Sequence, residues 1–174
     1  MTDAGKGNDY KNDENLFGYK KGDQVPQASC VLTPEVTFGP FWNEREALRQ
    51  DIRAGQTGIY QRLALQVIDI SNCKPLQGAR VDVWQANATG WYAKQARNQP
   101  GESDPHWLTG AQATTDWGLA DFDTIFPGHY YGRCVHTHVA VRPPGNFNGP
   151  DSFVHAGQIF FDDAAREVIE VNTS

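Results

Sequence analysis

Apolar and polar residues alternate along several short segments of this 174-residue chain. Successive side chains of a β-strand point to opposite faces, so this period-two pattern predicts strands with one face in a core. Clusters of Gly, Pro, Asn and Asp separate the segments, as turns between strands do. Many short strands with little helical pattern predict an all-β fold, an antiparallel β-sandwich with long loops. The predicted strands cover residues 63–70, 79–86, 119–126, 134–141 and 157–163.

Two stretches depart from this strand pattern. Residues Asn43–Gln50 predict a short helix, with Asn43 as a candidate N-cap. Residues 93–113 are expected to form a long loop, which in a compact domain is usually functional or mobile, and they carry His106 and Trp107.

Composition divides the chain and restricts its partners. Residues 1–28 hold many Asp, Asn, Lys and Gly and predict a flexible polar arm, which leaves 29–174 for the sandwich domain. The net charge of −6 and the lack of a long Lys/Arg run disfavour a nucleic-acid or anionic-membrane partner. No apolar run approaches the roughly 20 residues of a membrane-spanning helix. Because the N-terminus is polar, a secretion signal would have to precede this chain.

Three cysteines occur without the Cys-x-x-Cys spacing of structural zinc sites. Cys30 and Cys73 lie outside the strongest strand patterns and can pair, which leaves Cys134 free; three free thiols in a cytosolic protein are the alternative. Two Asn-x-Ser/Thr triplets, at Asn87 and Asn172, fit a secreted chain, although such triplets often arise by chance.

Residues 128–141, GHYYGRCVHTHVAV, concentrate imidazoles and phenols in one predicted strand and the turn before it. His136 and His138 are two residues apart, so they share a strand face about 7 Å apart and can share one metal ion. A solvent-facing pair is the alternative. Cys134 falls on the same face, so a zinc or copper site of Cys134, His136 and His138 also stays open.

Two tyrosines add a different kind of donor. Tyr130 follows a Pro-Gly turn just before the histidine strand, and Tyr92 follows the predicted strand 79–86. Phenolate suits a hard, strongly acidic metal, chiefly Fe(III), whose charge lowers the pKa of the phenol. Two histidines and two tyrosines would therefore indicate ferric iron, provided that they converge.

The chain resembles the intradiol ring-cleavage dioxygenases, and within them a short, secreted, fungal-type branch with a single domain. Four stretches between residues 30 and 163 carry the resemblance: 30–42, 65–92, 114–138 and 155–162. The most specific motif is PGxYxxRxxHxH, present as Pro127, Gly128, Tyr130, Arg133, His136 and His138.

The resemblance implies a role for each matching residue. Tyr92, Tyr130, His136 and His138 would bind non-haem Fe(III), with Tyr131 the rival of Tyr130. Tyr130 would also leave the metal and act as a base.

Two further residues match the positions that lie beside the substrate in the family. Arg133 would offset the negative charge that builds on the ring, and Gln158 would polarise the reacting group. Without the resemblance, a surface cation and an ordinary polar residue at a strand end are the favoured interpretations of Arg133 and Gln158.

The implied activity is Fe(III)-dependent intradiol cleavage of a catecholic ring by O2. Both oxygen atoms would enter the product, a cis,cis-muconate-type diacid, and NADH would not be needed. The substrate would be a small catechol, with plant phenolics among the candidates. The long N-terminal helical region that supplies the dimer contact in other branches has no counterpart here, so a secreted monomer is expected.

Two departures from the family pattern and one alternative function complete the sequence-based expectations. Phe38 replaces an acidic or small residue near the expected pocket wall, and Thr137 stands between the histidines where Ile is frequent. The alternative function is a non-catalytic β-sandwich module that binds sugars or proteins, in which the tyrosines and histidines would be loop and edge residues.

Overall fold

A computed structural model describes residues 30–42, 47–96, 106–145 and 152–164, together with residues 167 and 169. The strands pair antiparallel throughout, which confirms the predicted all-β fold. The predicted arm, residues 1–28, lies outside the described residues, and so does Asn172. Among the described residues, no helix combines the length and the apolar character needed to cross a lipid bilayer.

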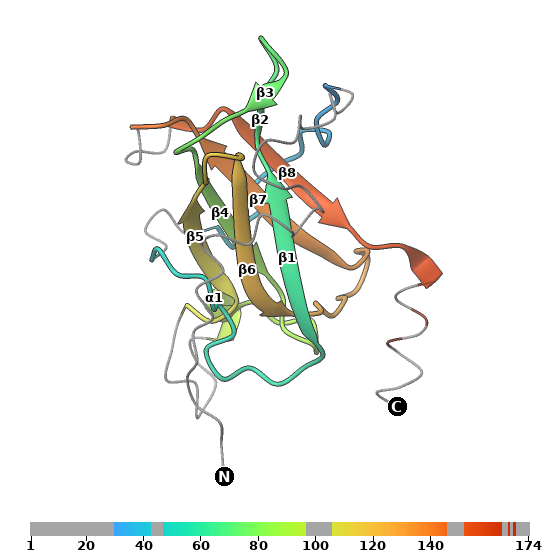
Figure 1. The fold of residues 1–174 in the computed structure, drawn as a ribbon. Coiled ribbons are helices and arrows are strands. Elements are labelled where there is room, and N and C mark those ends of the chain that lie inside the picture. Colours follow the sequence, from blue (N-terminus) through green and yellow to red (C-terminus); the bar gives the residue numbers. More distant parts are fainter. Residues whose placement is uncertain are drawn as a thin grey trace.

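Two sheets form the sandwich, and a small hairpin extends from it (Figure 1). The four-stranded sheet has the order β5-β4-β7-β8, and β1 pairs with β6 in front of it. The hairpin consists of β2 (Ile68–Asp69) and β3 (Lys74–Pro75). The longer strands are β1 (Tyr60–Gln66), β4 (Arg80–Gln85), β5 (Thr109–Ala113), β6 (Leu119–Ile125), β7 (His136–Arg142) and β8 (His155–Phe160).

The core lies between the two sheets. Alternate residues of β4 and β7 supply its back wall, and Leu63 of β1 and Phe122 of β6 pack against them. The wall residues are Val81, Val83, Val139 and Val141. Their neighbours in sequence must point to the outer face of the four-stranded sheet, because strand side chains alternate.

The outer face of the four-stranded sheet is buried too. Every residue of β4 and β7 is buried, although this face carries the charged residues Arg80, Asp82 and Arg142. The Asp82 carboxylate accepts hydrogen bonds from both arginines, so the buried charges are paired, as low dielectric requires. The guanidinium of Arg142 lies 3.9 Å from the ring centre of Phe153, one of the aromatic residues that cover this face.

The structure corrects the predicted helix at Asn43–Gln50. Residues 47–50 are not helical: Leu48 forms an isolated bridge with Ala111, and the Arg49 amide donates to the Ala111 carbonyl. Residues 43–46 lie outside the described residues. Backbone pairing with β5, and not the local helical pattern, therefore determines the conformation of residues 47–50.

The predicted loop at 93–113 contains secondary structure at both ends. The four-residue helix α1 (Ala93–Ala96) begins it, and β5 ends it as an edge strand along β4. The sequence of β5, TGAQA, has no large apolar residue, so alternation gave no signal for it. The remaining predicted strands agree with β1 and β2, β4, β6, β7 and β8 to within a few residues at either end.

Cys30 and Cys73 form a disulfide and Cys134 is free, as predicted. Cys134 is exposed. The disulfide fastens the start of segment 30–42 to the β2–β3 hairpin. The segment then runs beside β8, where Glu35 bridges Gly157 and the Val36 amide donates to the Ala156 carbonyl.

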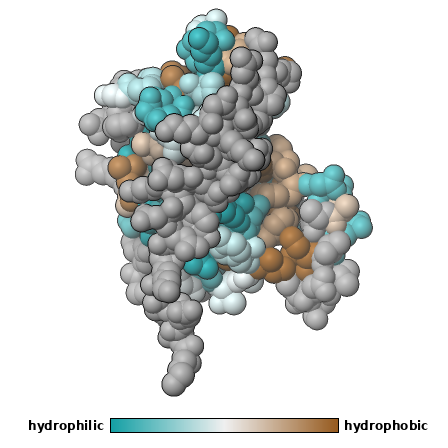
Figure 2. All heavy atoms as spheres, in the orientation of Figure 1, coloured by the Kyte–Doolittle hydropathy of each residue, from teal (hydrophilic) through white to brown (hydrophobic). Residues whose placement is uncertain are grey.

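In Figure 2, the surface of the drawn face mixes hydrophilic and hydrophobic residues, and hydrophobic ones gather on the side where β8 ends. Phe160, near the end of β8, is 56% exposed.

Replacing both Cys30 and Cys73 by Ser should lower the free energy of unfolding. The disulfide closes a loop of 43 residues, and the chain-entropy model gives about 4 kcal/mol for a loop of that length. We expect a loss of about 2–4 kcal/mol in urea denaturation. Cys134→Ser is the control and should change stability by less than about 0.5 kcal/mol. An unchanged unfolding midpoint in the double variant would mean that the disulfide does not constrain the chain.

Candidate metal centre

The two histidines of β7 point from the outer face of the four-stranded sheet toward a single point. His136 is 2% exposed and His138 is 3% exposed. Their Nε2 atoms lie 3.1 Å apart, although residues two apart on one strand face are separated by about 7 Å along the strand. Two nitrogen lone pairs that face one another at this distance are suited to sharing a cation.

A backbone hydrogen bond fixes the tautomer of His136. Its Nδ1 lies 2.7 Å from the carbonyl oxygen of Cys134, and a carbonyl only accepts, so Nδ1 must carry the proton. The Nε2 atom of His136 is then unprotonated and available to a metal. Metal-binding histidines in proteins are usually oriented by such a bond from the other ring nitrogen.

Cys134 therefore contributes its carbonyl, and its thiol is exposed. Across the described ranges, no cluster of three or more His, Cys, Asp or Glu side chains could hold a metal ion. The alternative zinc or copper site of Cys134, His136 and His138 is wrong, because the thiol does not reach the imidazole nitrogens.

Tyr92 joins the histidines from the loop between β4 and α1. Its hydroxyl lies 3.2 Å from Nε2 of His136 and donates to it, and the residue is 2% exposed. The ring of Tyr130 lies 5.9 Å from the rings of both Tyr92 and His136. Tyr131 is fully exposed, at 102% of its reference area. The structure thus places Tyr130, rather than Tyr131, beside two of the other predicted ligands, Tyr92 and His136.

Two glycines let the tyrosine loops meet. Gly90 and Gly128 each precede a predicted ligand tyrosine by two residues. A Cβ atom on Gly128 would lie 2.3 Å from the Ala88 carbonyl oxygen, and one on Gly90 would lie 2.4 Å from the His129 carbonyl oxygen. The Gly128 amide donates to the Asn87 carbonyl at 2.9 Å. Only residues without a side chain allow the two backbones to approach this closely.

The side chain of Asn87 shapes the Tyr92 loop itself. Its Oδ1 accepts hydrogen bonds from the backbone amides of Thr89 and Trp91 and from the Thr89 hydroxyl. This is an Asx-type turn, in which an asparagine side chain takes the place of a backbone acceptor. The turn reverses the chain after β4 and returns Tyr92 to the sheet face.

Burial sets the electrostatics of the site. Burial, followed by the charge of His136, lowers the pKa of His138 to about 3, and burial also lowers the pKa of His136. Both imidazoles are therefore neutral at pH 7 and keep their lone pairs. Burial raises the pKa of the Tyr92 phenol, and the neighbouring Tyr130 adds to the rise. A bound cation would offset this cost of ionising the phenol.

These four residues fit a ferric ion better than a softer metal. Two neutral nitrogen donors and two phenol oxygens can supply two negative charges, and no thiol takes part. Hard oxygen donors of this kind suit a small, highly charged metal.

Arg133 and Gln158, the predicted substrate-side residues, contact one another. The Arg133 Nη2 donates to Gln158 Oε1 at 2.7 Å. Gln158 is 4% exposed and lies opposite His138 in the β7–β8 register. A guanidinium and an amide thus lie together next to the histidines.

The structure adds residues that the sequence did not single out. Phe41 stacks on Tyr92 with ring centres 4.5 Å apart, and Trp84 stacks on His138 at 4.8 Å. The alternating pattern of β4 indicates only that Trp84 lies in a strand. The pairing of β4 with β7 brings it against His138. No sequence signal connects Phe41 to Tyr92, because 51 residues separate them.

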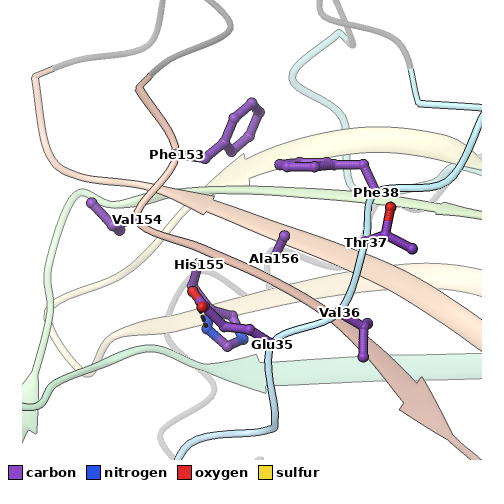
Figure 3. Close-up of a pocket in the computed structure, with 8 residues that line it drawn as sticks. All are labelled: Glu35, Val36, Thr37, Phe38, Phe153, Val154, His155 and Ala156. Atoms are coloured by element: carbon purple, nitrogen blue, oxygen red, sulfur yellow. Dashed lines mark ion pairs between the residues drawn. The ribbon is translucent and has the colours of Figure 1, made fainter.

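A cavity of about 510 Å³ lies beside the metal centre, between segment 35–38 and the start of β8 (Figure 3). Phe38 and Phe153 form its aromatic wall, and Glu35 and His155 approach each other at its edge. Phe38, which the family pattern places near the wall of the expected pocket, lines this cavity, and none of the four candidate ligands does so.

Comparison with known proteins identifies the family. Residues 38–144 match the model of a family described as dioxygenase. An intradiol ring-cleavage dioxygenase from Tetranychus urticae is 35% identical, with a TM-score of 0.71, and the alignment covers 82% of this chain and 71% of that one. The chain belongs to the intradiol ring-cleavage dioxygenases. This membership supports an enzyme over the non-catalytic binding module.

Two other members of known structure are more distant from this dioxygenase. The dioxygenase domain of a carbohydrate-binding fusion protein from Streptomyces sp. SirexAA-E is 28% identical, with 74% of each chain covered and a TM-score of 0.57. Catechol 1,2-dioxygenase from Pseudomonas arvilla C-1 is 26% identical, with a TM-score of 0.60. That alignment covers 74% of this chain and 45% of the other.

Gly128→Ala should separate the two tyrosine loops and weaken the metal centre. The added methyl group would overlap the Ala88 carbonyl, so we expect a loss of about 1–3 kcal/mol in stability and weaker uptake of Fe(III). Gly55→Ala is the control, because nothing lies within 4 Å of a Cβ atom there. Its left-handed backbone should cost about 1 kcal/mol without affecting metal uptake. Equal metal uptake by both variants would show that the close approach at Gly128 is not needed.

Proposed function

We propose that this dioxygenase cleaves catechols between their two hydroxylated carbons, with O2 as co-substrate and a ferric ion held by Tyr92, Tyr130, His136 and His138. One observation carries the proposal. In a buried site, the Nε2 atom of His136 lies 3.2 Å from the Tyr92 hydroxyl and 3.1 Å from the Nε2 atom of His138. The Tyr130 ring lies beside the ring of His136. Burying one phenol and two imidazoles together beside a second, half-buried phenol is costly unless a bound group satisfies them.

Ferric iron at this site would act as a Lewis acid that makes both catechol hydroxyls more acidic and orients the ring for reaction with O2. The protein supplies the acceptor for the released proton. Tyr130 suits this role better than Tyr92, because Tyr130 is only half-buried, whereas Tyr92 is 2% exposed and packed under Phe41. We therefore assign the mobile, proton-accepting phenol to Tyr130 and the fixed one to Tyr92.

Arg133 and Gln158 would act on the ring of the substrate. The guanidinium of Arg133 supplies a positive charge where negative charge grows on the deprotonated ring. Its hydrogen bond to Gln158 Oε1 orients the amide, whose Nε2 lies 3.5 Å from the Thr37 carbonyl oxygen, a long contact that substrate can replace. Phe41 and Trp84 exclude water from the ligand side of the site.

The overall reaction balances without a further reductant. A catechol and one O2 give a diacid that retains every atom of both, so the ring supplies the electrons that reduce oxygen. The product is a cis,cis-muconate-type diacid. We also propose that the protein functions in an oxidising compartment outside the cell. The Cys30–Cys73 disulfide supports this location, since reducing compartments keep thiols free.

Oxygen uptake with a panel of catechols tests the activity. The purified protein should bind one Fe(III), absorb broadly in the visible range through phenolate-to-iron charge transfer, and convert catechols to diacids. Tyr92→Phe should weaken and shift the visible absorption and remove most of the turnover, because it removes the fixed phenol and leaves only Tyr130 as a phenolate donor. Tyr60→Phe, a tyrosine 55% exposed on β1, is the control and should retain both. A colourless protein with bound iron, or normal turnover in Tyr92→Phe, would contradict the ligand set.

Arg133→Ala should retain iron and colour but slow the reaction. Because Arg133 stabilises charge on the ring and does not bind metal, we expect a decrease in kcat of about 10- to 100-fold with little change in iron content. The control is Arg53→Ala, since Arg53 pairs with Asp51 at the surface. Stopped-flow measurement of ring cleavage compares the two variants, and Arg53→Ala should keep the rate of the parent protein. If the Arg133 variant kept the rate of the parent protein, Arg133 would have only a structural role.

A further inference from the structure

The two candidate ligand histidines are held in different ways. His136 donates its Nδ1 proton to the Cys134 carbonyl, which fixes the angle of the ring. The Nδ1 atom of His138 is buried and has no hydrogen-bond partner among the described residues. A metal-binding histidine almost always has such a partner, because the bond orients the ring and raises its basicity. Something else must therefore hold the His138 imidazole at its angle.

Trp84 is the group that lies against this imidazole. The two rings are nearly parallel, at 5°, with centres 4.8 Å apart. They come from directly opposite positions of β4 and β7, so the register of the sheet itself places the indole there. Cross-strand aromatic pairs of this kind stabilise a sheet beyond the burial of their area.

Gly39 restricts the imidazole as well. A Cβ atom at Gly39 would lie 3.4 Å from the Cε1 atom of His138, so the backbone of segment 30–42 passes close to the ring. A partial rotation of the imidazole about its Cβ–Cγ bond would break the stack with Trp84 and move Nε2 away from its position 3.1 Å from the Nε2 of His136. The stack thus holds the plane of the ring with Nε2 facing the candidate metal centre, and only a complete half-turn, which would direct Cε1 there instead, preserves the stack.

The indole is itself fixed. Trp84 is 1% exposed, and the ring of Phe38 lies nearly parallel to it, at 9°, with centres 6.1 Å apart. Phe38 in turn packs edge-on against Phe153. The indole therefore cannot swing away from His138 without disturbing the aromatic layer on this face of the sheet.

We propose that Trp84 is the positioning residue of His138, and that ring stacking does for this ligand what a hydrogen bond does for His136. The inference rests on the proposed function, since it takes His138 as a metal ligand. Trp84 does not touch the reacting atoms. It acts by keeping Nε2 of His138 directed at the metal, so its loss should reduce metal affinity and distort the ligand geometry without removing a ligand.

Nuclear magnetic resonance of the metal-free protein tests the stacking directly. With histidines labelled by carbon-13, the His138 ring signals should be shifted upfield by the ring current of Trp84. Trp84→Leu should abolish this shift and broaden the signals as the ring samples several orientations, and Trp84→Phe should keep a smaller shift. Trp107→Leu is the control, because Trp107 is equally buried but belongs to another cluster. His138 signals that are the same in Trp84→Leu and the parent protein would overturn the proposal.

Metal titration tests the consequence. Competition with a chelator should show Fe(III) bound about 10- to 100-fold more weakly by Trp84→Leu, with a displaced visible absorption band. Trp84→Phe should bind within a few-fold of the parent protein, and Trp107→Leu should match the parent. Unchanged affinity and colour in Trp84→Leu would overturn the proposal.

Two further outcomes are distinguishable. If Trp84→Leu does not fold, Trp84→Phe decides: affinity within a few-fold of the parent supports stacking, and a loss as large as that of His138→Ala overturns it. If the parent protein binds no Fe(III), the proposed function fails. The resonance experiment then still decides whether Trp84 fixes the imidazole.

Discussion

The structure depends on the pairing of β4 with β7, two strands that are buried on both faces. Their inner valines form the core, so their outer residues must also find partners or cover, because polar groups out of water are costly. At one end of the outer face, Asp82 satisfies two arginines. At the other end, His136 and His138 direct their nitrogens at one another, an arrangement that a metal ion would satisfy.

The cover of this outer face is also part of the candidate site. Segment 30–42 begins at the disulfide, pairs with β8 and then places Gly39 against His138 and Phe41 against Tyr92. The same aromatic side chains that shield the sheet thus shape the walls of the metal centre. Stability and function are coupled here, since loosening the cover would expose the buried charges and the ligands together.

Much of the fold followed from local patterns, and the errors have physical causes. Alternation located the long strands, because a strand with one core face must alternate. It missed β5, because Thr109–Ala113 contain no large apolar residue. It also assigned a helix to 43–50, where pairing with β5 and not the helical pattern determines residues 47–50. Edge pairing is a long-range contact, which a local window does not contain.

The sequence by itself determined the donors: two histidines two residues apart on a strand, and two tyrosines each two residues after a glycine, in a pattern that resembles one enzyme family. It did not determine that they meet. Only the tertiary structure decided that Gly90 and Gly128 bring the tyrosine loops together, that Cys134 offers its carbonyl instead of its thiol, and that Trp84 lies against His138. These contacts join residues far apart in the chain or depend on backbone geometry, and both are properties of the packed fold.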